Sequence, residues 1–207
     1  MARPTAWHPP EPLPLPLRVT EATVDVHRDA DAPALLEAFR VSRKSLVPWM
    51  PWAANGLVDE GAALDLIRAD ARQRGYARPE SFPLGLFDGS SPRRVLGGTG
   101  FVRIDAELAQ AELGYWLRPE ARGLGLCTEV VGRLITSGFG DWGFRRILVG
   151  CDGANLPSVR VAERLGLRRE THEIAARWLP GHGWCDHVGF AVLAHEWDRE
   201  GHRGPAA

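Results

Sequence analysis

Two glycines one residue apart, Gly123 and Gly125, follow Arg122 and precede an apolar pattern with helical spacing. Glycine carries no side chain, so another molecule can approach the main chain closely at both positions. The first amides of a helix have no partner within it, and the helix dipole favours an anion there. The stretch therefore predicts that main-chain amides from about Arg122 to Thr128 hold a phosphate group. A flexible connection between a strand and a helix is the simpler alternative.

Two common phosphate-binding motifs do not fit this turn. A P-loop places a lysine and a hydroxyl residue after its last glycine, whereas Leu126 and Cys127 follow Gly125 here. A dinucleotide fingerprint has a third glycine three residues after Gly125, where this chain has Thr128. A pyrophosphate held by amides at the start of a helix is the interpretation that remains.

The composition excludes several classes of protein. The 207 residues are enough for one domain, and 44% hydrophobic residues with a formal net charge of -1 are typical of a soluble globular protein. Nothing shows the basic excess of a nucleic-acid-binding protein, and no run approaches the roughly 20 apolar residues of a membrane helix. Three widely spaced cysteines predict free thiols in a reducing cytoplasm rather than a disulfide framework.

The elements needed to position the turn can be read from periodicity. The order is a strand, two helices, an antiparallel meander, the glycine-rich turn into a helix, another strand, a helix and a closing hairpin. The expected strands cover 17–26, 82–88, 94–104, 111–117, 145–151, 172–179 and 186–193, and the expected helices cover 31–46, 59–75, a segment from about 126, and 155–166. This order predicts an α+β fold with a mixed, mostly antiparallel sheet flanked by helices.

The domain boundaries follow from the proline content and from the ends of these elements. Residues 1–15 are rich in proline and are expected to form a flexible arm. Residues 16–197 are expected to form a single domain, and residues 198–207 a disordered tail.

The stretch "AELGYWLRPEARGLGLCTEVV", followed by Asn155 and Ser158 three residues apart and then by "ERLG", resembles the GCN5-related N-acetyltransferase (GNAT) superfamily. The segment "SLVPWMPWA" resembles the RimJ/RimL branch of ribosomal-protein N-terminal acetyltransferases. The resemblance covers about residues 16–197 and implies the GNAT fold. It also implies direct transfer of an acetyl group from acetyl-CoA to a primary amine, with the N-terminal α-amine of a protein or peptide as the expected acceptor.

The resemblance also implies which residues contact acetyl-CoA. The family's loop pattern begins with Gln or Arg, but Glu120 stands there, so no phosphate contact is expected from that side chain. The implied contacts are Leu117, Arg122, Gly123, Leu124, Gly125, Leu126, Cys127, Thr128, Asn155 and Ser158. Cys127 is expected to be a small packing residue rather than a covalent nucleophile.

An amine must be neutral to attack a thioester, and α-amino groups have a pKa of about 7.7 to 8.0, so a general base is useful. Glu112 stands where histone-acetylating members of the superfamily have a catalytic glutamate, which makes it the candidate base. A solvent-facing strand residue is an alternative of equal weight. Reserve candidates are Asp105, Glu107 and Glu173.

The departing thiolate benefits from a proton donor. Most superfamily members have a tyrosine seven residues after the Asn, where this chain has Ala162. The RimJ/RimL resemblance implies that Ser158 serves instead, and that Asn155 contacts the pantetheine arm of CoA. The alternatives are a helix hydroxyl bonded to its own backbone and an ordinary N-cap.

Aromatic residues supply the expected acceptor site. Trp49 and Trp52, with Pro51 between them, and Tyr115 are predicted to form its wall, although packing in a core or loop is commoner for such residues. His182, Cys185 and His187 in "HGWCDH" could suggest a metal site. No metal is expected, because only Cys185 and His187 would share a strand face and acetyl transfer needs none.

Other functions remain open from the sequence. The same fold could acetylate a small-molecule amine or an antibiotic, could bind acyl-CoA without catalysis, or could be structural with no ligand. The expected partners are acetyl-CoA and an amine acceptor, and relatives of the branch imply a homodimer. The sequence does not identify the acceptor or the length of the acyl group.

Overall fold

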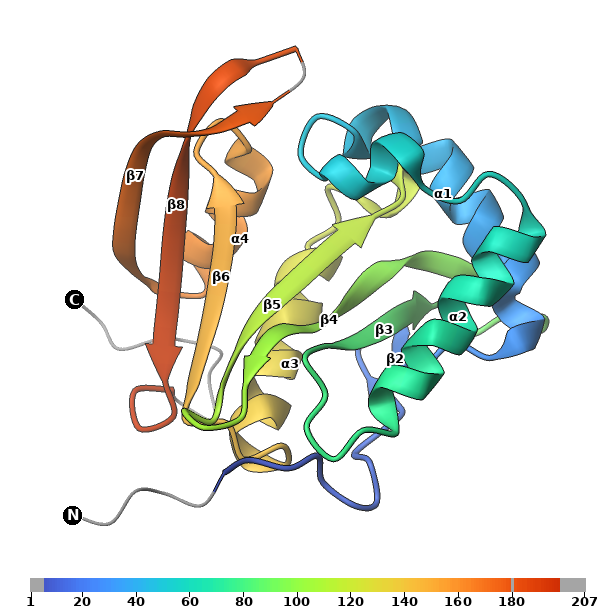
Figure 1. The fold of residues 1–207 in the computed structure, drawn as a ribbon, viewed down its shortest axis with the longest axis horizontal. Coiled ribbons are helices and arrows are strands. Elements are labelled where there is room, and N and C mark those ends of the chain that lie inside the picture. Colours follow the sequence, from blue (N-terminus) through green and yellow to red (C-terminus); the bar gives the residue numbers. More distant parts are fainter. Residues whose placement is uncertain (1–5, 180, 198–207) are drawn as a thin grey trace.

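An eight-stranded sheet forms the centre of the fold (Figure 1), in the order β1-β2-β3-β4-β5-β6-β8-β7. The computed structural model describes residues 6–179 and 181–197. The strands are β1 (Leu17–Arg18), β2 (Thr23–Asp25), β3 (Phe82–Phe87), β4 (Val95–Asp105), β5 (Gln110–Leu117), β6 (Arg146–Asp152), β7 (Arg168–Leu179) and β8 (Gly183–Leu193). All neighbouring strands pair antiparallel except β5 and β6, which confirms the predicted single α+β domain with a mixed sheet.

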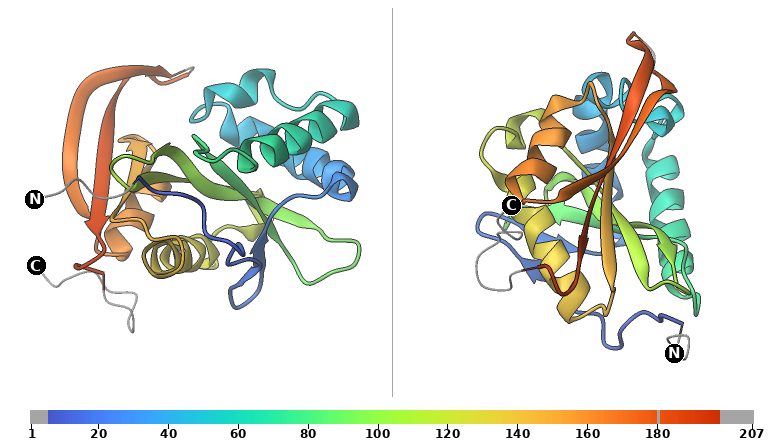
Figure 2. Two further views of the ribbon diagram at one scale, coloured as in Figure 1. Left: turned by 60° about the horizontal axis from the view of Figure 1, so that its bottom comes forward. Right: turned by 90° about the vertical axis from the view of Figure 1, so that its left-hand side faces the viewer.

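Helices cover both faces of the sheet (Figure 2). The α-helices are α1 (Ala32–Leu46), α2 (Glu60–Arg74), α3 (Leu126–Gly140) and α4 (Leu156–Arg164), and the 3-10 helices are η1 (Asp29–Asp31), η2 (Pro51–Asn55) and η3 (Pro119–Ala121). The helices α1 and α2 lie on one face, and α3 and α4 lie on the other. Among the described residues, no helix has both the length and the apolar character of a membrane span.

The main core lies between α3 and the sheet. Val130, Val131, Leu134 and Ile135 are all buried on one face of α3, as the helical spacing predicts. They belong to the same cluster as the fully buried aromatic and aliphatic side chains of the central strands, among them Phe82, Phe101, Leu113 and Ile147. This core holds the start of α3 in a fixed position against the sheet.

The strands β5 and β6 pair only over a short stretch. Their parallel register joins Gln110 to Arg146, Ala111 to Ile147 and Glu112 to Leu148. Beyond Glu112 the two strands diverge, so the sheet opens at one end like a fork (Figure 1).

The first expected strand is divided. Residues 17–26 were predicted as one strand, but the chain turns back on itself so that β1 pairs antiparallel with β2 through Leu17 and Val24. Val19 donates its N–H to the carbonyl of Ala22 across the intervening turn. The alternating pattern predicted extended backbone correctly but gave no sign of the turn.

The proline-rich arm is attached to the core in the part that the structure describes. Trp7 is 5% exposed, its ring stacks on Phe144 at 4.7 Å, and its Nε1 donates to the carbonyl of Trp142 at 2.6 Å. Residues 6–15 therefore do not form the free arm expected from their prolines, because one aromatic side chain fixes the segment. The predicted tail at residues 198–207 lies outside the described residues.

Replacing Trp7 by alanine should lower the free energy of unfolding by about 3–5 kcal/mol, because a stacked and hydrogen-bonded core ring is lost. Trp184→Ala is the control, since Trp184 is 67% exposed and its loss should cost about 1 kcal/mol or less. Chemical denaturation followed by far-UV circular dichroism measures both. Equal effects of the two substitutions would show that the N-terminal segment does not contribute to the core.

Candidate active site

A cavity of about 570 Å³ opens where β5 and β6 separate. Its walls come from the end of α1 and the following loop, from β5, from the glycine turn and the start of α3, and from β6 and α4. The lining residues are Ser45, Leu46, Trp49, Met50, residues 112–117, residues 121–123, residues 125–128, residues 150–152, Asn155, Pro157, Ser158, Arg160, Val161, Arg164 and Arg177. The fork in the sheet therefore brings the glycine turn, β5 and α4 to one space.

The glycine turn presents bare main chain to this cavity. Gly123 and Gly125 have φ of +80° and +81°, a region that side chains rarely tolerate, and a Cβ atom at either would have no atom within 4 Å. The first helical hydrogen bond of α3 runs from the N–H of Glu129 to the carbonyl of Gly125 at 3.1 Å. The amides of residues 126–128 come before this first hydrogen bond and form the positive end of the helix dipole. The turn therefore fits a pyrophosphate group.

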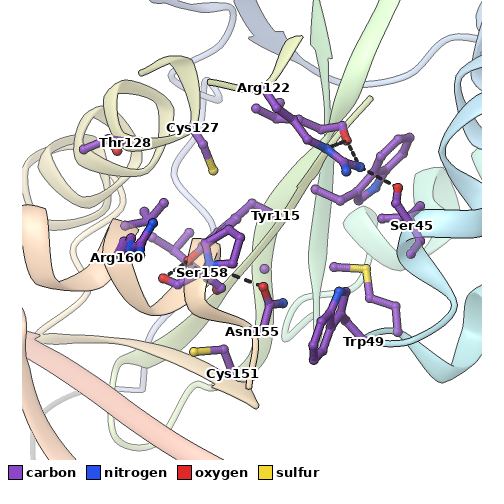
Figure 3. A pocket seen from close by; sticks show the side chains of 18 of the residues that line it. Ser45, Trp49, Tyr115, Arg122, Cys127, Thr128, Cys151, Asn155, Ser158 and Arg160 are labelled. Atoms are coloured by element: carbon purple, nitrogen blue, oxygen red, sulfur yellow. Dashed lines mark hydrogen bonds between the residues drawn. The ribbon is translucent and has the colours of Figure 1, made fainter. Parts of the chain in front are cut away.

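Arg122 secures the turn to α1. Its Nε and Nη2 donate to the carbonyl of Leu117 at 2.9 and 2.6 Å, and Nη2 also donates to Ser45 Oγ at 2.8 Å. Figure 3 shows the Arg122 guanidinium reaching toward Ser45. Arg122 thus lies at the cavity, as expected, while its charged group is engaged by the protein.

Two neighbours of the turn lie away from the cavity. Glu120 forms ion pairs with Arg94 at 3.0 Å and Arg118 at 2.7 Å, which accounts for its departure from the family pattern. The Leu124 side chain is 80% exposed and does not line the cavity, although it was expected to contact the cofactor. The other nine expected cofactor contacts all line it.

The hydroxyl groups of Tyr115 and Ser158 lie 2.9 Å apart across the cavity wall (Figure 3), and either can donate to the other. Ser158 N–H donates to Asn155 Oδ1, so Asn155 caps α4 and lines the cavity at once. Burial raises the pKa of Tyr115, and the bond to Ser158 partly opposes this. Both hydroxyls therefore stay protonated and can supply a proton to a group in the cavity.

The two cysteines of the cavity are protonated thiols. Burial raises the pKa of Cys127 to about 12, against the opposing charge of Arg122. Burial also raises the pKa of Cys151. A thiol nucleophile needs a lowered pKa, so the environment of Cys127 supports the expected packing role.

Glu112 occupies the point where β5 and β6 part. It lines the cavity and is ion-paired with Arg103 of β4. A Cβ atom on Gly150 of β6 would lie 3.0 Å from Glu112 Oε1 and 3.1 Å from His187 Nε2, so these two side chains cover the same glycine. The arrangement places a carboxylate at the cavity and leaves little room for a side chain on Gly150.

The reserve carboxylates lie elsewhere. Glu107 is ion-paired with Arg78 at 2.7 Å, and Asp105 accepts the N–H of Leu108 at 3.0 Å. Glu173 is exposed on β7. None of the three lines the cavity, so Glu112 is the one predicted base that does, and Asp152 of β6 is a further carboxylate in the lining.

The expected acceptor residues are split between two cavities. Trp49 lines the one described above and stacks on His182 at 4.7 Å, while Tyr115 lines both cavities. Trp52 is half exposed, lies 5.8 Å from Phe39 and lines a second cavity beneath α1 and α2. The two tryptophans therefore do not share one wall.

The residues of "HGWCDH" are spread over the hairpin of β7 and β8. His182 lies on Trp49, Cys185 is buried, and His187 lies beside Glu112. Among the residues that the structure describes, no three His, Cys, Asp or Glu side chains gather in a way that could hold a metal ion.

Sequence reasoning missed three arginines. Arg160 and Arg164 are four residues apart on α4, and Arg177 lies on β7; all three line the cavity. The sequence did carry a signal for two of them. Arg160 and Arg164 have the spacing of one helical face, on the helix that begins after Asn155. Their charges add cations to a cavity that already presents helix amides.

Comparison with known proteins identifies the family. The model of the acetyltransferase (GNAT) domain matches residues 23–168. The chain is 31% identical over 120 residues to the uncharacterised N-acetyltransferase YnaD of Bacillus subtilis (strain 168), covering 58% of this chain and 67% of YnaD. It is 27% identical over 179 residues to YdaF of the same organism, a candidate ribosomal N-acetyltransferase, covering 86% and 94%. The chain belongs to the GNAT family and is an N-acetyltransferase.

Solved structures show the same fold. The ribosomal L7/L12 α-N-protein acetyltransferase RimL in complex with coenzyme A superposes with a TM-score of 0.75 at 21% identity, covering 84% of this chain and 95% of RimL. The Mycobacterium smegmatis RimJ structure gives a TM-score of 0.73 at 20% identity, covering 84% and 83%. The Microcin C7 self-immunity acetyltransferase MccE, in complex with acetyl-CoA and AMP, gives 0.74 at 22% identity, covering 84% and 93%.

Gly125→Val should weaken CoA binding by about a hundredfold or more, because a branched side chain would keep phosphate from the amides of the turn. Gly143→Val is the matched control. Gly143 also has a positive φ of +72° and open space at its Cβ position, but it does not line the cavity. Both variants carry a similar backbone strain. Calorimetric titration with CoA therefore separates the loss of the phosphate site from the effect of that strain. Equal affinities in the two variants would contradict the assignment of the turn.

Proposed function

We propose that this N-acetyltransferase binds acetyl-CoA in the cavity between β5 and β6 and transfers the acetyl group directly to the N-terminal α-amine of a protein or peptide. The observation that carries the proposal is that one cavity is lined by both a bare amide turn and a pair of hydrogen-bonded hydroxyls. The turn suits the pyrophosphate of CoA, and the hydroxyls suit a departing sulfur.

The chain's own groups account for binding. Amides of residues 123–128 would hold the pyrophosphate, and Arg160 and Arg164 would add charge for further phosphate oxygens. Asn155 caps α4 and thereby fixes where this helix begins beside the cavity. Acetyl-CoA supplies the acetyl group as a thioester, a bond that an amine can break without a metal.

Proton transfer to the sulfur falls to Ser158. As the new C–N bond forms and the C–S bond breaks, the sulfur leaves with the electron pair of the C–S bond and requires a proton. Ser158 Oγ, which lies 2.9 Å from the Tyr115 hydroxyl, can give its proton to the sulfur and regain one from water in the cavity. Burial raises the pKa of Tyr115, so its hydroxyl stays protonated and holds Ser158 in place through their hydrogen bond.

Proton removal from the amine falls to Glu112. Its carboxylate lies at the fork of the sheet, lines the same cavity and is held in place by Arg103. At this position the carboxylate can accept the proton that the amine loses, directly or through one water.

Two relatives and the aromatic lining support the acceptor class. RimL is described as an α-N-protein acetyltransferase, and YdaF is a candidate ribosomal N-acetyltransferase. The aromatic wall of Trp49 and Tyr115 beside the cavity offers a surface for a peptide. The homodimer implied by the resemblance stays a prediction.

The test of this function is thiol release from acetyl-CoA with a panel of acceptors: peptides with free N-termini, lysine side chains with blocked N-termini, and polyamines. The proposal expects the highest kcat/KM for free N-termini. Preference for small amines would instead identify a small-molecule acetyltransferase, and binding of acetyl-CoA without any thiol release would identify a non-catalytic acyl-CoA-binding module.

Ser158→Ala should lower kcat by about tenfold to ten-thousandfold with little change in acetyl-CoA affinity, because proton donation to the sulfur is lost. Tyr115→Phe should have a smaller effect of the same kind, since Ser158 then lacks only its hydrogen-bond partner. Stopped-flow thiol release and calorimetry measure the two quantities. An unchanged kcat in Ser158→Ala would show that Ser158 is not the proton donor and is an ordinary helix residue.

Glu112→Gln should impair the reaction most at low pH. A substrate amine with a pKa of about 8 loses its proton unaided as pH rises, so the defect in kcat/KM should shrink with pH. The Ser158→Ala defect should persist at every pH, which provides the internal comparison. A Glu112→Gln profile lowered by the same factor throughout would remove Glu112 as the base.

A further inference from the structure

A second cavity, of about 380 Å³, lies between the helices α1 and α2 and the strands β3 to β5. Its lining is mostly apolar and includes Leu35 and Phe39 of α1, Trp52 and Leu57 of the following loop, Leu66 of α2, Leu84 of β3, Val102 of β4 and Trp116 of β5. Such a lining excludes water around whatever occupies the space.

The second cavity adjoins the active-site cavity. Met50, Gly114, Tyr115 and Trp116 line both, so the two spaces meet at β5. A molecule whose amine lies beside Tyr115 can therefore extend its next group into the second cavity. The occupant of the second cavity is therefore part of the same acceptor molecule that presents its amine in the active site.

One carboxylate opens into the second cavity without a partner. Asp70 of α2 lines it, and among the described residues no group hydrogen-bonds or ion-pairs with its carboxylate within bonding distance. Burial raises the pKa of Asp70 to about 6, and the charge of Arg74 partly opposes this. At neutral pH the carboxylate is thus mostly ionised and poorly solvated, which favours a cation from outside.

A buried histidine completes the polar end. His27, just after β2, lines the cavity, is 9% exposed, and its buried Nδ1 has no hydrogen-bond partner among the described residues. Burial lowers the pKa of His27 to about 4, so the ring is neutral at neutral pH and does not repel a cation. Arg74 does not line the cavity, and its guanidinium lies over the ring of Phe82.

We propose that the second cavity receives the side chain that follows the reactive amine, and that it selects one with an apolar stem and a cationic end. The apolar lining takes the stem, and Asp70 takes the cation. The inference rests on the proposed function and names its substrate class: peptides with lysine or arginine close to the free N-terminus. A diamine shares this chemistry, and the experiment separates the two sources.

The experiment compares kcat/KM for two peptides that differ at the second residue. One carries lysine there and the other norleucine, which keeps the stem and removes the charge. A diamine and a monoamine of equal length form a second pair. The parent enzyme should prefer the lysine peptide by about tenfold or more, and the preference should exceed that between the two small amines.

Asp70→Asn should bring the ratio between the lysine and norleucine peptides close to one, because the amide keeps the shape and loses the charge. Asp65→Asn is the control, since Asp65 is exposed on the same helix and does not line the cavity. Asp65→Asn should keep the parent ratio. Thermal unfolding of each variant shows whether it is folded.

A second variant fills the cavity instead of changing its charge. Leu66→Trp should lower kcat/KM for both peptides about tenfold or more by occupying the space of the stem. Leu108→Trp is the control, because Leu108 is exposed to a similar extent, 46% against 42% for Leu66, and lines neither cavity. The pair keeps the inference testable if Asp70→Asn does not fold.

The outcomes separate this inference from the function beneath it. If no amine in either pair is acetylated, the proposed function fails. If peptides are acetylated but the parent ratio is near one, or if Asp70→Asn keeps the parent ratio, this inference is overturned and the function stands. A larger ratio for the small amines than for the peptides would likewise overturn the peptide assignment.

Discussion

The separation of β5 from β6 is the constraint on which the site depends. The two strands share only three register pairs, ending at Glu112 and Leu148, and then diverge. Parallel strands that continued to pair would close the space that the cavity occupies. Because they part, the second half of β5 faces a cavity, and the turn that follows it can present its amides there.

The candidate catalytic and binding groups follow one another along the two branches of this fork. Glu112 stands at the last pair, Tyr115 three residues further along β5, and the glycine turn beyond the end of the strand. Ser158 arrives from the other branch of the fork, because α4 follows β6. The hydrogen bond between the hydroxyl groups of Tyr115 and Ser158 thus connects β5 to α4 across the opening. The second cavity, which we propose takes part of the acceptor, lies on the side of β5 that α1 and α2 cover.

The sequence predicted the elements with strong local signals. Apolar residues at helical spacing identified α3, and Gly125 with its positive φ begins that helix as the turn required. The local pattern predicted Asn155 as the N-cap of α4, and Asn155 does cap that helix, whereas the role of Ser158 was implied by the family resemblance. These features depend on residues close together in the chain, which is why a single sequence carries them.

The features that were missed depend on distant contacts. Tyr115 and Ser158 are 43 residues apart, and their bond exists only because the strands diverge. Trp49 and Trp52 are three residues apart, but η2 begins at Pro51 between them and places them in different cavities. Trp7 was assigned to a free arm because of the prolines around it. Its stacking partner, Phe144, lies far along the chain and cannot be inferred from those prolines.

Amide hydrogen exchange on addition of CoA tests the central claim most directly, because it reports on the main chain of the turn without relying on any substitution. The account predicts that the amides of residues 123–128 become protected from exchange, while those of the turn around Gly143, which also has a positive φ, keep their rates. Protection elsewhere with unchanged exchange at residues 123–128 would contradict the assignment of the fork and its amide turn as the CoA site.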